Sequence, residues 1–340
     1  MIEAKTLCVK EGERVLLDGL SFVMEGKGIH GVLGPVGSGK TALTRVLMGD
    51  LFPTSGELLL DGESVAEDRS PSLLARKKKI GYMPTDLTPY EDMTLYELLV
   101  FVGGIKKMDS ERLYRQAMEA LRLVELEDYI NCLISKLNNA KRRRFAIAVS
   151  LIGNPELLIL DEPTAGLGAV AAEEIRALVE MLGTKKMILL CTRFPEEAEA
   201  LCSDLLMLSR GQQVVFDTTE NLNQKLRKTE NVTLTVRAPK PLAEALCEKL
   251  MALSGVVSCK TAGAAKNGGY TLKLETKPAS DRRRQIEKLL AEEGSALLTF
   301  ESMILSLEDA YLALTEPVSV SVKEPKKPSG KREKRKEENR

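Results

Sequence analysis

Residues 34–41 read GPVGSGKT, which fits the pattern G-x-x-x-x-G-K-[S/T] of a phosphate-binding loop. Glycines in such a loop let consecutive backbone N–H groups turn toward phosphate oxygens, and the start of the following helix adds partial positive charge. The ammonium group of Lys40 suits the β- and γ-phosphates of a nucleotide, and the hydroxyl of Thr41 suits Mg²⁺. The pattern predicts a phosphate site with a bound cation.

A carboxylate pair, Asp161 and Glu162, ends the apolar run LLILDE. An aspartate at the end of a buried strand can hold Mg²⁺ through water, and a glutamate beside it can orient or deprotonate an attacking water molecule. Such a pair can also be a simple turn or helix cap. After a phosphate-binding loop, it predicts a site that hydrolyses a nucleotide.

The elements around these residues have the order that the chemistry requires. An apolar strand precedes the loop, and the segment TALTRVLMG after it is helical in pattern. Residues 94–126 carry apolar side chains at three- and four-residue spacing, which predicts helices. ELLILDEP and KMILLCT are short, continuous apolar runs, as expected for strands of a buried parallel sheet.

After about residue 218 the pattern changes. Residues 230–315 predict the order β-α-β-β-α-β, followed by the short helix SLEDAYLAL, which is typical of a small ferredoxin-like α+β unit. Residues 316–340 are rich in Pro, Lys and Glu, with nine basic and four acidic side chains in 317–340, and we expect them to be disordered. The predicted domains are therefore 1–220, 230–315 and a basic tail, 316–340.

The composition excludes several classes of protein. The formal net charge is zero, so the whole molecule does not have the charge of a nucleic-acid binder. Six scattered cysteines without a C-x-x-C pair and one histidine argue against a zinc site or a disulfide scaffold and fit a reducing cytosol. We find no signal peptide and no apolar run long enough to span a bilayer.

Over about residues 2–220 the sequence resembles the ATP-binding subunits of ABC transporters. The resemblance rests on the phosphate loop, the helical insert, LLILDEPTAGL, and the final pattern CTRFPEEAEALCSDLLMLSRG. The C-terminal unit is similar to that of exporters of the ABC-2 type, including those akin to gliding-motility transporters. The resemblance implies an α/β P-loop NTPase fold of ABC type, with a mixed sheet core, an antiparallel β subdomain and a helical subdomain.

The stretch KLNNAKRRRF departs from this family. In the family, two subunits sandwich two ATP molecules, and an LSGGQ-like signature of one subunit caps the ATP on the other. The signature aligns with residues 137–141, so Asn138 replaces a serine that donates to the γ-phosphate and Ala140 replaces a glycine. Asparagine is also a good helix N-cap, and its amide can still donate. A nucleic-acid patch is the competing interpretation of this basic run, and the lack of interleaved aromatic residues speaks against it.

Four other family positions differ as well. Where the family has an aromatic residue that stacks on adenine, this chain has Glu11, which removes a contribution of about 1 kcal/mol to binding. The glutamine that links Mg²⁺ to the permease surface falls at Thr85, the aspartate of the family's SALD-like loop falls at Gly168, and the switch histidine falls at Arg193. An arginine can hold a γ-phosphate oxygen but cannot relay a proton. His30 precedes the phosphate loop on a strand, so we expect it to be a packed strand residue.

The resemblance and the motifs together predict ATP and Mg²⁺ as cofactors. The predicted catalytic residues are Glu162, Lys40 and Arg193, and the predicted metal ligands are Thr41, Asp161 and Thr85. The predicted nucleotide-binding residues are Gly34, Pro35, Val36, Gly37, Ser38, Gly39, Lys40, Thr41, Thr44 and Asp161, with Asn138 and Ala140 acting on the ATP of a partner subunit.

The resemblance implies an energising subunit that couples ATP binding and hydrolysis to a separate membrane permease. It would dimerise, with itself or with a second ATP-binding subunit, and lie in the cytoplasm against the membrane through its permease. No nucleic-acid partner is expected. Because several positioning groups are replaced, we expect slow hydrolysis. The alternative is a pseudo-ATPase that regulates a membrane partner by nucleotide-dependent dimerisation. A soluble ABC protein acting on ribosomes or DNA is a weaker hypothesis.

Overall fold

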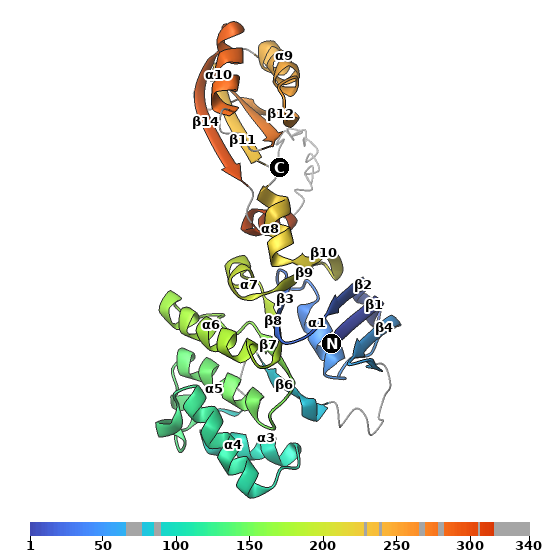
Figure 1. The fold of residues 1–340 in the computed structure, drawn as a ribbon, viewed down its shortest axis with the longest axis vertical. Helices are drawn as coiled ribbons and strands as arrows, with labels where there is room; N and C mark the ends of the chain where they lie inside the picture. The colour runs from blue at the N-terminus through green and yellow to red at the C-terminus, as the bar shows by residue number, and fades with distance from the viewer. Residues whose placement is uncertain are drawn as a thin grey trace, which may run out of the picture.

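The computed structural model describes residues 1–65, 77–84, 90–227, 230–237, 240–264, 269–277, 282–304 and 307–315. The predicted tail, 316–340, lies outside the described residues. Two sheets organise the chain. One has ten strands in the order β5-β4-β1-β2-β10-β9-β3-β8-β7-β6, and the other has four, in the order β12-β13-β11-β14. Figure 1 shows the four-stranded sheet standing away from the larger one, beyond helix α8.

The ten-stranded sheet lies in the N-terminal part of the chain, residues 1–218. Its strands are β1 (Ile2–Glu11), β2 (Arg14–Met24), β3 (Gly28–Leu33), β4 (Ser55–Leu60), β5 (Glu63–Ser64), β6 (Ile80–Met83), β7 (Leu157–Asp161), β8 (Met187–Thr192), β9 (Asp204–Ser209) and β10 (Gln212–Thr218). The helices of this N-terminal part are α1 (Lys40–Leu47), α3 (Leu95–Ile105), α4 (Ser110–Leu123), α5 (Asn139–Leu151), α6 (Ala169–Gly183) and α7 (Pro195–Leu201).

Strands β9, β3, β8, β7 and β6 run parallel to one another. Every residue of β7 and β8 is buried, which explains their continuous apolar runs. Strand β3 pairs with β8, and β8 pairs with β7, so their carboxyl ends meet at one edge of the sheet. That edge carries the phosphate loop after β3, Asp161 and Glu162 at the end of β7, and Arg193 after β8.

The antiparallel strands β5, β4, β1 and β2 form the other end of the sheet, as the sequence predicts. Helices α3, α4 and α5 form the helical insert (Figure 1). Each of these helices begins at a side-chain cap. Thr94 and Glu97 make a capping box at α3, Asp109 accepts from the N–H of Arg112 at α4, and Asn138 caps α5.

His30 lies on β3, is 2% exposed, and contacts Asp204 with an Nδ1–Oδ2 distance of 2.8 Å. The prediction of a packed strand histidine is confirmed.

The four-stranded sheet, residues 230–304, is called here the C-terminal unit. Its elements are β11 (Glu230–Arg237), α9 (Lys240–Met251), β12 (Val256–Ala264), β13 (Tyr270–Thr276), α10 (Arg282–Glu292) and β14 (Ala296–Ile304). All its strand pairs are antiparallel, and β11 lies between β13 and β14. This order of elements agrees with the ferredoxin-like pattern predicted from the sequence.

Two helices connect the C-terminal unit to the N-terminal part: α8 (Thr219–Arg227) before it and α11 (Leu307–Thr315) after it. The domain boundary predicted at residue 220 falls inside α8. Helix α11, predicted as the end of the accessory domain, packs on α7 and α8.

Candidate nucleotide site

The phosphate loop connects β3 to α1. Gly37 and Gly39 have φ values of 78° and 112°, which L side chains rarely adopt. A Cβ on Gly34 would lie 2.3 Å from Ser38 Oγ and 2.5 Å from the carbonyl oxygen of Leu208. The loop is therefore wound too tightly for a side chain at Gly34, and α1 begins immediately after it, at Lys40.

Lys40 is 5% exposed, and its Nζ donates to the carbonyl oxygens of Gly34 at 2.5 Å and Pro35 at 3.1 Å. Burial lowers the pKa of Lys40, and the nearby carboxylate of Glu162 partly offsets this effect. The Lys40 Nζ–Glu162 Oε1 distance is 3.9 Å. The lysine thus lies inside the loop with its charge directed toward the ends of the parallel strands.

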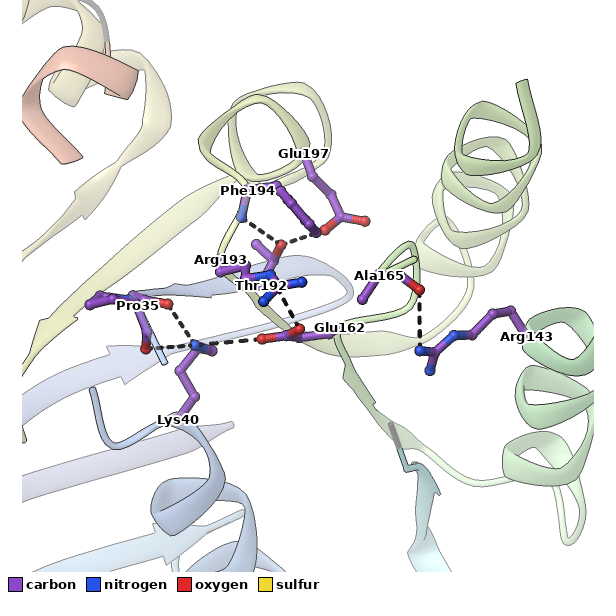
Figure 2. A network of polar contacts seen from close by, with 10 residues as sticks. Pro35, Lys40, Arg143, Glu162, Ala165, Thr192, Arg193, Phe194 and Glu197 are labelled. Atoms are coloured by element: carbon purple, nitrogen blue, oxygen red, sulfur yellow. Dashed lines mark hydrogen bonds and ion pairs between the residues drawn. The ribbon is translucent and has the colours of Figure 1, made fainter. Parts of the chain in front are cut away.

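Glu162 lies between two cations at the end of β7 (Figure 2). Its backbone has φ 49°, and its N–H donates to the carbonyl oxygen of Cys191 on β8 at 2.8 Å. Arg193 Nε lies 3.6 Å from the other carboxylate oxygen, Glu162 Oε2. The arginine side chain is 41% exposed and stacks 5.1 Å from the centre of the Phe194 ring. The structure therefore brings the three predicted catalytic residues together.

A buried glutamate beside this group was missed from the sequence. Glu197, on α7, is fully buried and accepts from the hydroxyl of Thr192 at 2.5 Å. The same hydroxyl accepts from the N–H of Phe194 at 3.1 Å. Burial raises the pKa of Glu197, while hydrogen bonds from Thr192 and Thr164 oppose the shift. The signal in the sequence was an acidic residue on the apolar face of PEEAEALC.

Through these contacts Glu197 joins three segments: the end of β8, the first turn of α7, and the loop that follows Glu162, where Thr164 lies. Figure 2 shows this group directly beside the Lys40–Glu162–Arg193 contacts. The position of Arg193 therefore depends on α7.

A cavity of about 660 Å³ opens over the phosphate loop. Asp161, Glu162, Lys40 and Thr41 line its phosphate end. The cavity continues to a second end lined by Glu11, Arg14, Val15, Arg45 and Arg210. Among the described residues that line it none is aromatic, and Arg45 Nη2 lies 3.4 Å from Glu11 Oε1.

The residues of this cavity fit MgATP. The hydroxyl of Thr41 is exposed at the start of α1, Asp161 is 6% exposed at the end of β7, and Ser38 Oγ is buried without a hydrogen-bond partner. A helix N-terminus, a lysine and inward-turned backbone N–H groups suit phosphate, while a hydroxyl and a carboxylate suit Mg²⁺. Thr41 and Asp161 are the residues that would hold the cation.

Other predicted site residues lie differently. Val36 is 80% exposed at the loop tip. The hydroxyl of Thr44 is buried and donates to the carbonyl oxygen of Thr41 at 3.0 Å. It is thus bonded within α1, and Thr44 does not line the cavity. Thr85 lies outside the described residues. The roles of all three stay predictions.

The signature segment starts α5. Asn138 Oδ1 accepts from the N–H of Lys141 at 2.9 Å, which confirms the predicted N-cap and leaves the amide NH₂ to donate elsewhere. Asn139 Nδ2 donates to the carbonyl oxygen of Gly166 at 3.0 Å, and Arg143 donates to that of Ala165 at 3.2 Å. The start of α5 is therefore tied to the loop that follows Glu162.

The other cations of this run also have contacts within the chain. Arg142 pairs with Glu91 at 2.7 Å, and Arg144 pairs with Glu125 at 2.6 Å and with Glu174 at 3.0 Å. Lys141 lies 3.7 Å from the centre of the Tyr129 ring. These contacts explain the run as part of the fold and favour the helix-start interpretation over a nucleic-acid patch.

The parallel sheet, the phosphate loop and the carboxylate pair define a P-loop nucleotide-binding protein. Comparison with known proteins shows which kind of P-loop protein this part of the chain resembles: the family model for ABC transporters matches residues 17–165. The Nod factor export ATP-binding protein I of Cupriavidus metallidurans is 34% identical over 204 residues, which cover 60% of this chain and 66% of that protein. The human cholesterol transporter ABCA5 is 30% identical over 225 residues, 65% of this chain and 14% of that protein.

Two solved structures show the same fold. The cbiO1 protein from Clostridium perfringens, part of an ABC transporter complex, has a TM-score of 0.60 at 22% identity and covers 67% of this chain and 93% of that one. The cassette MJ0796, described as a dimer bound to ADP and phosphate, has a TM-score of 0.57 at 23% identity and covers 64% and 99%. Residues 17–165 of this chain therefore match the ABC transporter family, and the chain is similar to the ATP-binding proteins of such transporters.

The matched region spans slightly less than two thirds of the length of the Nod factor export relative. Within the part of the chain that the structure describes, no helix is both long and apolar enough to cross a membrane.

Proposed function

We propose that this chain binds MgATP, hydrolyses it slowly on its own, and uses the cycle to drive a separate membrane permease from the cytoplasmic side. One observation carries the proposal. Glu162 lies between Lys40 and Arg193, at 3.9 Å and 3.6 Å, at the phosphate end of a cavity that fits a nucleotide.

Each residue has a chemical role in this proposal. Lys40 neutralises the β- and γ-phosphates, and the backbone N–H groups of residues 34–41 hold their oxygens. Glu162 accepts a proton from the water that attacks the γ-phosphorus atom. Arg193 holds a γ-phosphate oxygen through the N–H groups of its guanidinium. When bound, Mg²⁺ neutralises charge that develops on the phosphates, and Thr41 with Asp161 would hold it.

A second copy, or a related ATP-binding subunit, completes the site. In this chain Asn138 and Ala140 begin α5, and neither lines the cavity above its own phosphate loop. These two residues would therefore act in a dimer of the kind that the family forms, in which α5 of one subunit faces the ATP bound to the other. The Cβ of Ala140 would stand where backbone must approach phosphate. Loss of such positioning groups costs roughly 10²–10³-fold in rate when they act in the transition state, so we propose slow turnover.

A permease contact has a candidate surface. A second cavity, of about 380 Å³, lies between β6 and the helical insert. Its apolar wall includes Ile80, Tyr82, Pro84, Leu98, Val102 and Ile105. Lys106 lines it too and donates to the carbonyl oxygens of Ile80 and Ile152, and burial lowers the pKa of Lys106 to about 8. An apolar groove with lysines at its rim suits an amphipathic segment of a membrane protein.

The test uses the purified full chain. Calorimetry measures MgATP binding, and phosphate release measures turnover. We expect binding, slow turnover in the wild type, and loss of turnover with retained binding in Glu162→Gln. Glu180→Gln, at an exposed glutamate of α6, is the matched control and should behave as the wild type.

The outcomes separate the alternatives. Absence of nucleotide binding would refute the proposal. Binding without any turnover, together with nucleotide-dependent dimerisation, would favour the pseudo-ATPase. Turnover that persists in Glu162→Gln would show that the carboxylate does not have the role assigned to it.

A further inference from the structure

Two of the six cysteines lie against each other in the C-terminal unit. The Sγ atoms of Cys247, on α9, and Cys259, on β12, are 2.6 Å apart, and both thiols are free. A disulfide bond is about 2.05 Å long, so the two sulfur atoms need to approach by only about half an ångström to be bonded. The cysteines stand 12 positions apart in the sequence, and the packing of α9 on β12 brings them together (Figure 1).

The core of the C-terminal unit holds both cysteines in place. Leu250, almost one turn after Cys247 on α9, is fully buried in that core. On β12, Cys259 and Thr261 share one face because side chains alternate along a strand, and Thr261 Oγ1 lies 3.8 Å from Cys247 Sγ. Cys259 pairs with Leu274 of β13, which is 2% exposed. The face of β12 that carries Cys259 is thus covered by α9, and the contact of the two sulfur atoms follows from core packing.

One of the two sulfur atoms is more accessible than the other. Cys247 is 9% exposed, whereas Cys259 is half-buried, so a small oxidant meets the sulfur of Cys259 first. Burial raises the pKa of the Cys259 thiol, and the adjoining Cys247 adds to the shift. Because the thiolate is the nucleophile, the reaction is slow at neutral pH and becomes faster as pH increases. A thiolate of high pKa is also a poor leaving group, so a disulfide bond at Cys259 is reduced slowly once it has formed.

The remaining four cysteines have different surroundings. Cys8 and Cys132 are half-buried, and each sulfur lies near a main-chain carbonyl oxygen, at 3.6 Å and 3.5 Å. Cys191 and Cys202 are 0% and 6% exposed in the core of the N-terminal part. We therefore expect an internal bond to form in the C-terminal unit and these four thiols to remain after it has formed.

We propose that Cys247 and Cys259 are a modification site for hydrogen peroxide, at which a disulfide bond locks β12, an edge strand of the four-stranded sheet, to α9. The sulfur of Cys259 attacks one peroxide oxygen, the O–O bond breaks, and the leaving hydroxide takes up the thiol proton to become water. The sulfur of Cys247 then attacks the sulfenic acid on Cys259, the S–O bond breaks, and a second water molecule leaves as the S–S bond forms. In total the two thiols lose two electrons and two protons, and one peroxide molecule is reduced to two water molecules.

The first experiment maps the bond in the full chain. The reduced protein is treated with hydrogen peroxide at about pH 8, where the thiolate is more abundant than at neutral pH. Free thiols are then blocked with iodoacetamide, and the protein is digested with trypsin without a reductant. Lys249 lies between the two cysteines, so trypsin separates residues 238–249 from residues 250–260 unless a disulfide bond joins them.

The joined peptides should appear in the wild type and in Cys132→Ser, the matched control at a half-buried cysteine outside the pair. They should be absent from Cys259→Ser and should separate after reduction with dithiothreitol. Separate, alkylated peptides from the peroxide-treated wild type would overturn the inference. Joined peptides that are lost in Cys132→Ser would also overturn it, because the bond would then depend on a thiol outside the pair.

Cys247→Ser tests the order of the two steps. The variant removes the thiol that closes the bond and leaves Cys259 to be oxidised alone. Dimedone, which labels sulfenic acids, should react with Cys259 in this variant and not in the wild type, where Cys247 consumes the intermediate. Equal labelling of Cys259 in both proteins would show that Cys247 does not act on it, and this result would refute the proposed second step.

Hydrogen exchange measures the locking of β12. The bond closes a short loop and removes freedom from the opened state, so amide exchange in residues 240–264 should slow at least about tenfold on oxidation. Residues 169–183, in α6, are the internal control and should exchange at the same rate in both forms, and Cys259→Ser should show no change. Equal exchange of residues 240–264 in the two forms would overturn the proposed lock. None of these measurements involves ATP, so a negative result here leaves the proposed function as it stands.

Discussion

The carboxyl of Glu197 offers the sharpest test of how the catalytic edge of the sheet is held together. Glu197→Ala removes the acceptor of the hydrogen bond from Thr192, whose hydroxyl is fully buried. Leaving the proton of a buried hydroxyl without an acceptor costs about 1–3 kcal/mol. We therefore take about 2 kcal/mol for the decrease in the free energy of unfolding. For a part of this size that is a decrease of roughly 4–8 °C in melting temperature.

Glu197→Gln tests the ionisation of the same residue. Burial raises the pKa of Glu197 above its ordinary value of 4.5, against the hydrogen bonds from Thr192 and Thr164 and the charge of Arg176, with Glu196 adding to the increase. The folded state therefore binds this proton more tightly than the unfolded state. The stabilisation is complete below pH 4.5 and is lost as pH rises through the folded pKa. Glutamine does not titrate, so the variant should gain stability relative to the wild type as pH increases.

The assay is thermal unfolding from about pH 4.5 to about pH 8, a window that starts near the pKa of an ordinary glutamate. Glu180→Gln, at an exposed glutamate of α6, is the control and should follow the wild-type curve with a constant offset. If the Glu197→Gln curve also runs parallel to the wild type over the whole window, the carboxyl does not titrate as the structure implies. A melting temperature for Glu197→Ala within about 1 °C of the wild type would refute the assignment of the hydrogen bond, because a buried hydroxyl whose proton has lost its acceptor must cost more.

Three further predictions concern the nucleotide. Asn138→Ser combined with Ala140→Gly should raise phosphate release at least tenfold, because both restore close contact with the γ-phosphate of the partner's ATP, and an unchanged rate would mean that the signature does not limit turnover. Glu11→Tyr should tighten ATP binding about fivefold in calorimetry, the effect of about 1 kcal/mol of stacking on adenine; binding that is unchanged or weaker would place the base elsewhere. Gly34→Ala should abolish nucleotide binding and lower the melting temperature, since its Cβ would lie 2.3 Å from Ser38 Oγ; near-normal binding would contradict the tight loop.

Local patterns in the sequence were sufficient for much of the site. The phosphate loop, the carboxylate pair after an apolar strand, and the N-cap at Asn138 each involve residues within a few positions of one another, where backbone geometry follows from residue type. The buried strands β7 and β8 were also predictable, because strands covered on both faces must be apolar throughout.

The family pattern predicted Arg193 at the position of the switch histidine, but only the structure showed that Glu162 is its ion-pair partner. The contact between Arg193 and Glu162 joins residues that follow different strands, and it exists because β7 and β8 pair in register. Glu197 was missed for a similar reason. In the sequence it is one glutamate among several in α7, and its place on the apolar face is a weak signal until the packing shows that it is the buried one.

The sequence by itself was sufficient to predict a phosphate loop at residues 34–41 and an acidic pair after a buried strand, because a tight glycine turn and an apolar strand are local properties. The tertiary structure alone decided that Glu162 lies between Lys40 and Arg193, and that α11 returns to α7 after the C-terminal unit. Such contacts depend on the register of a sheet and on the docking of helices far apart in the chain, which no short stretch of residues encodes.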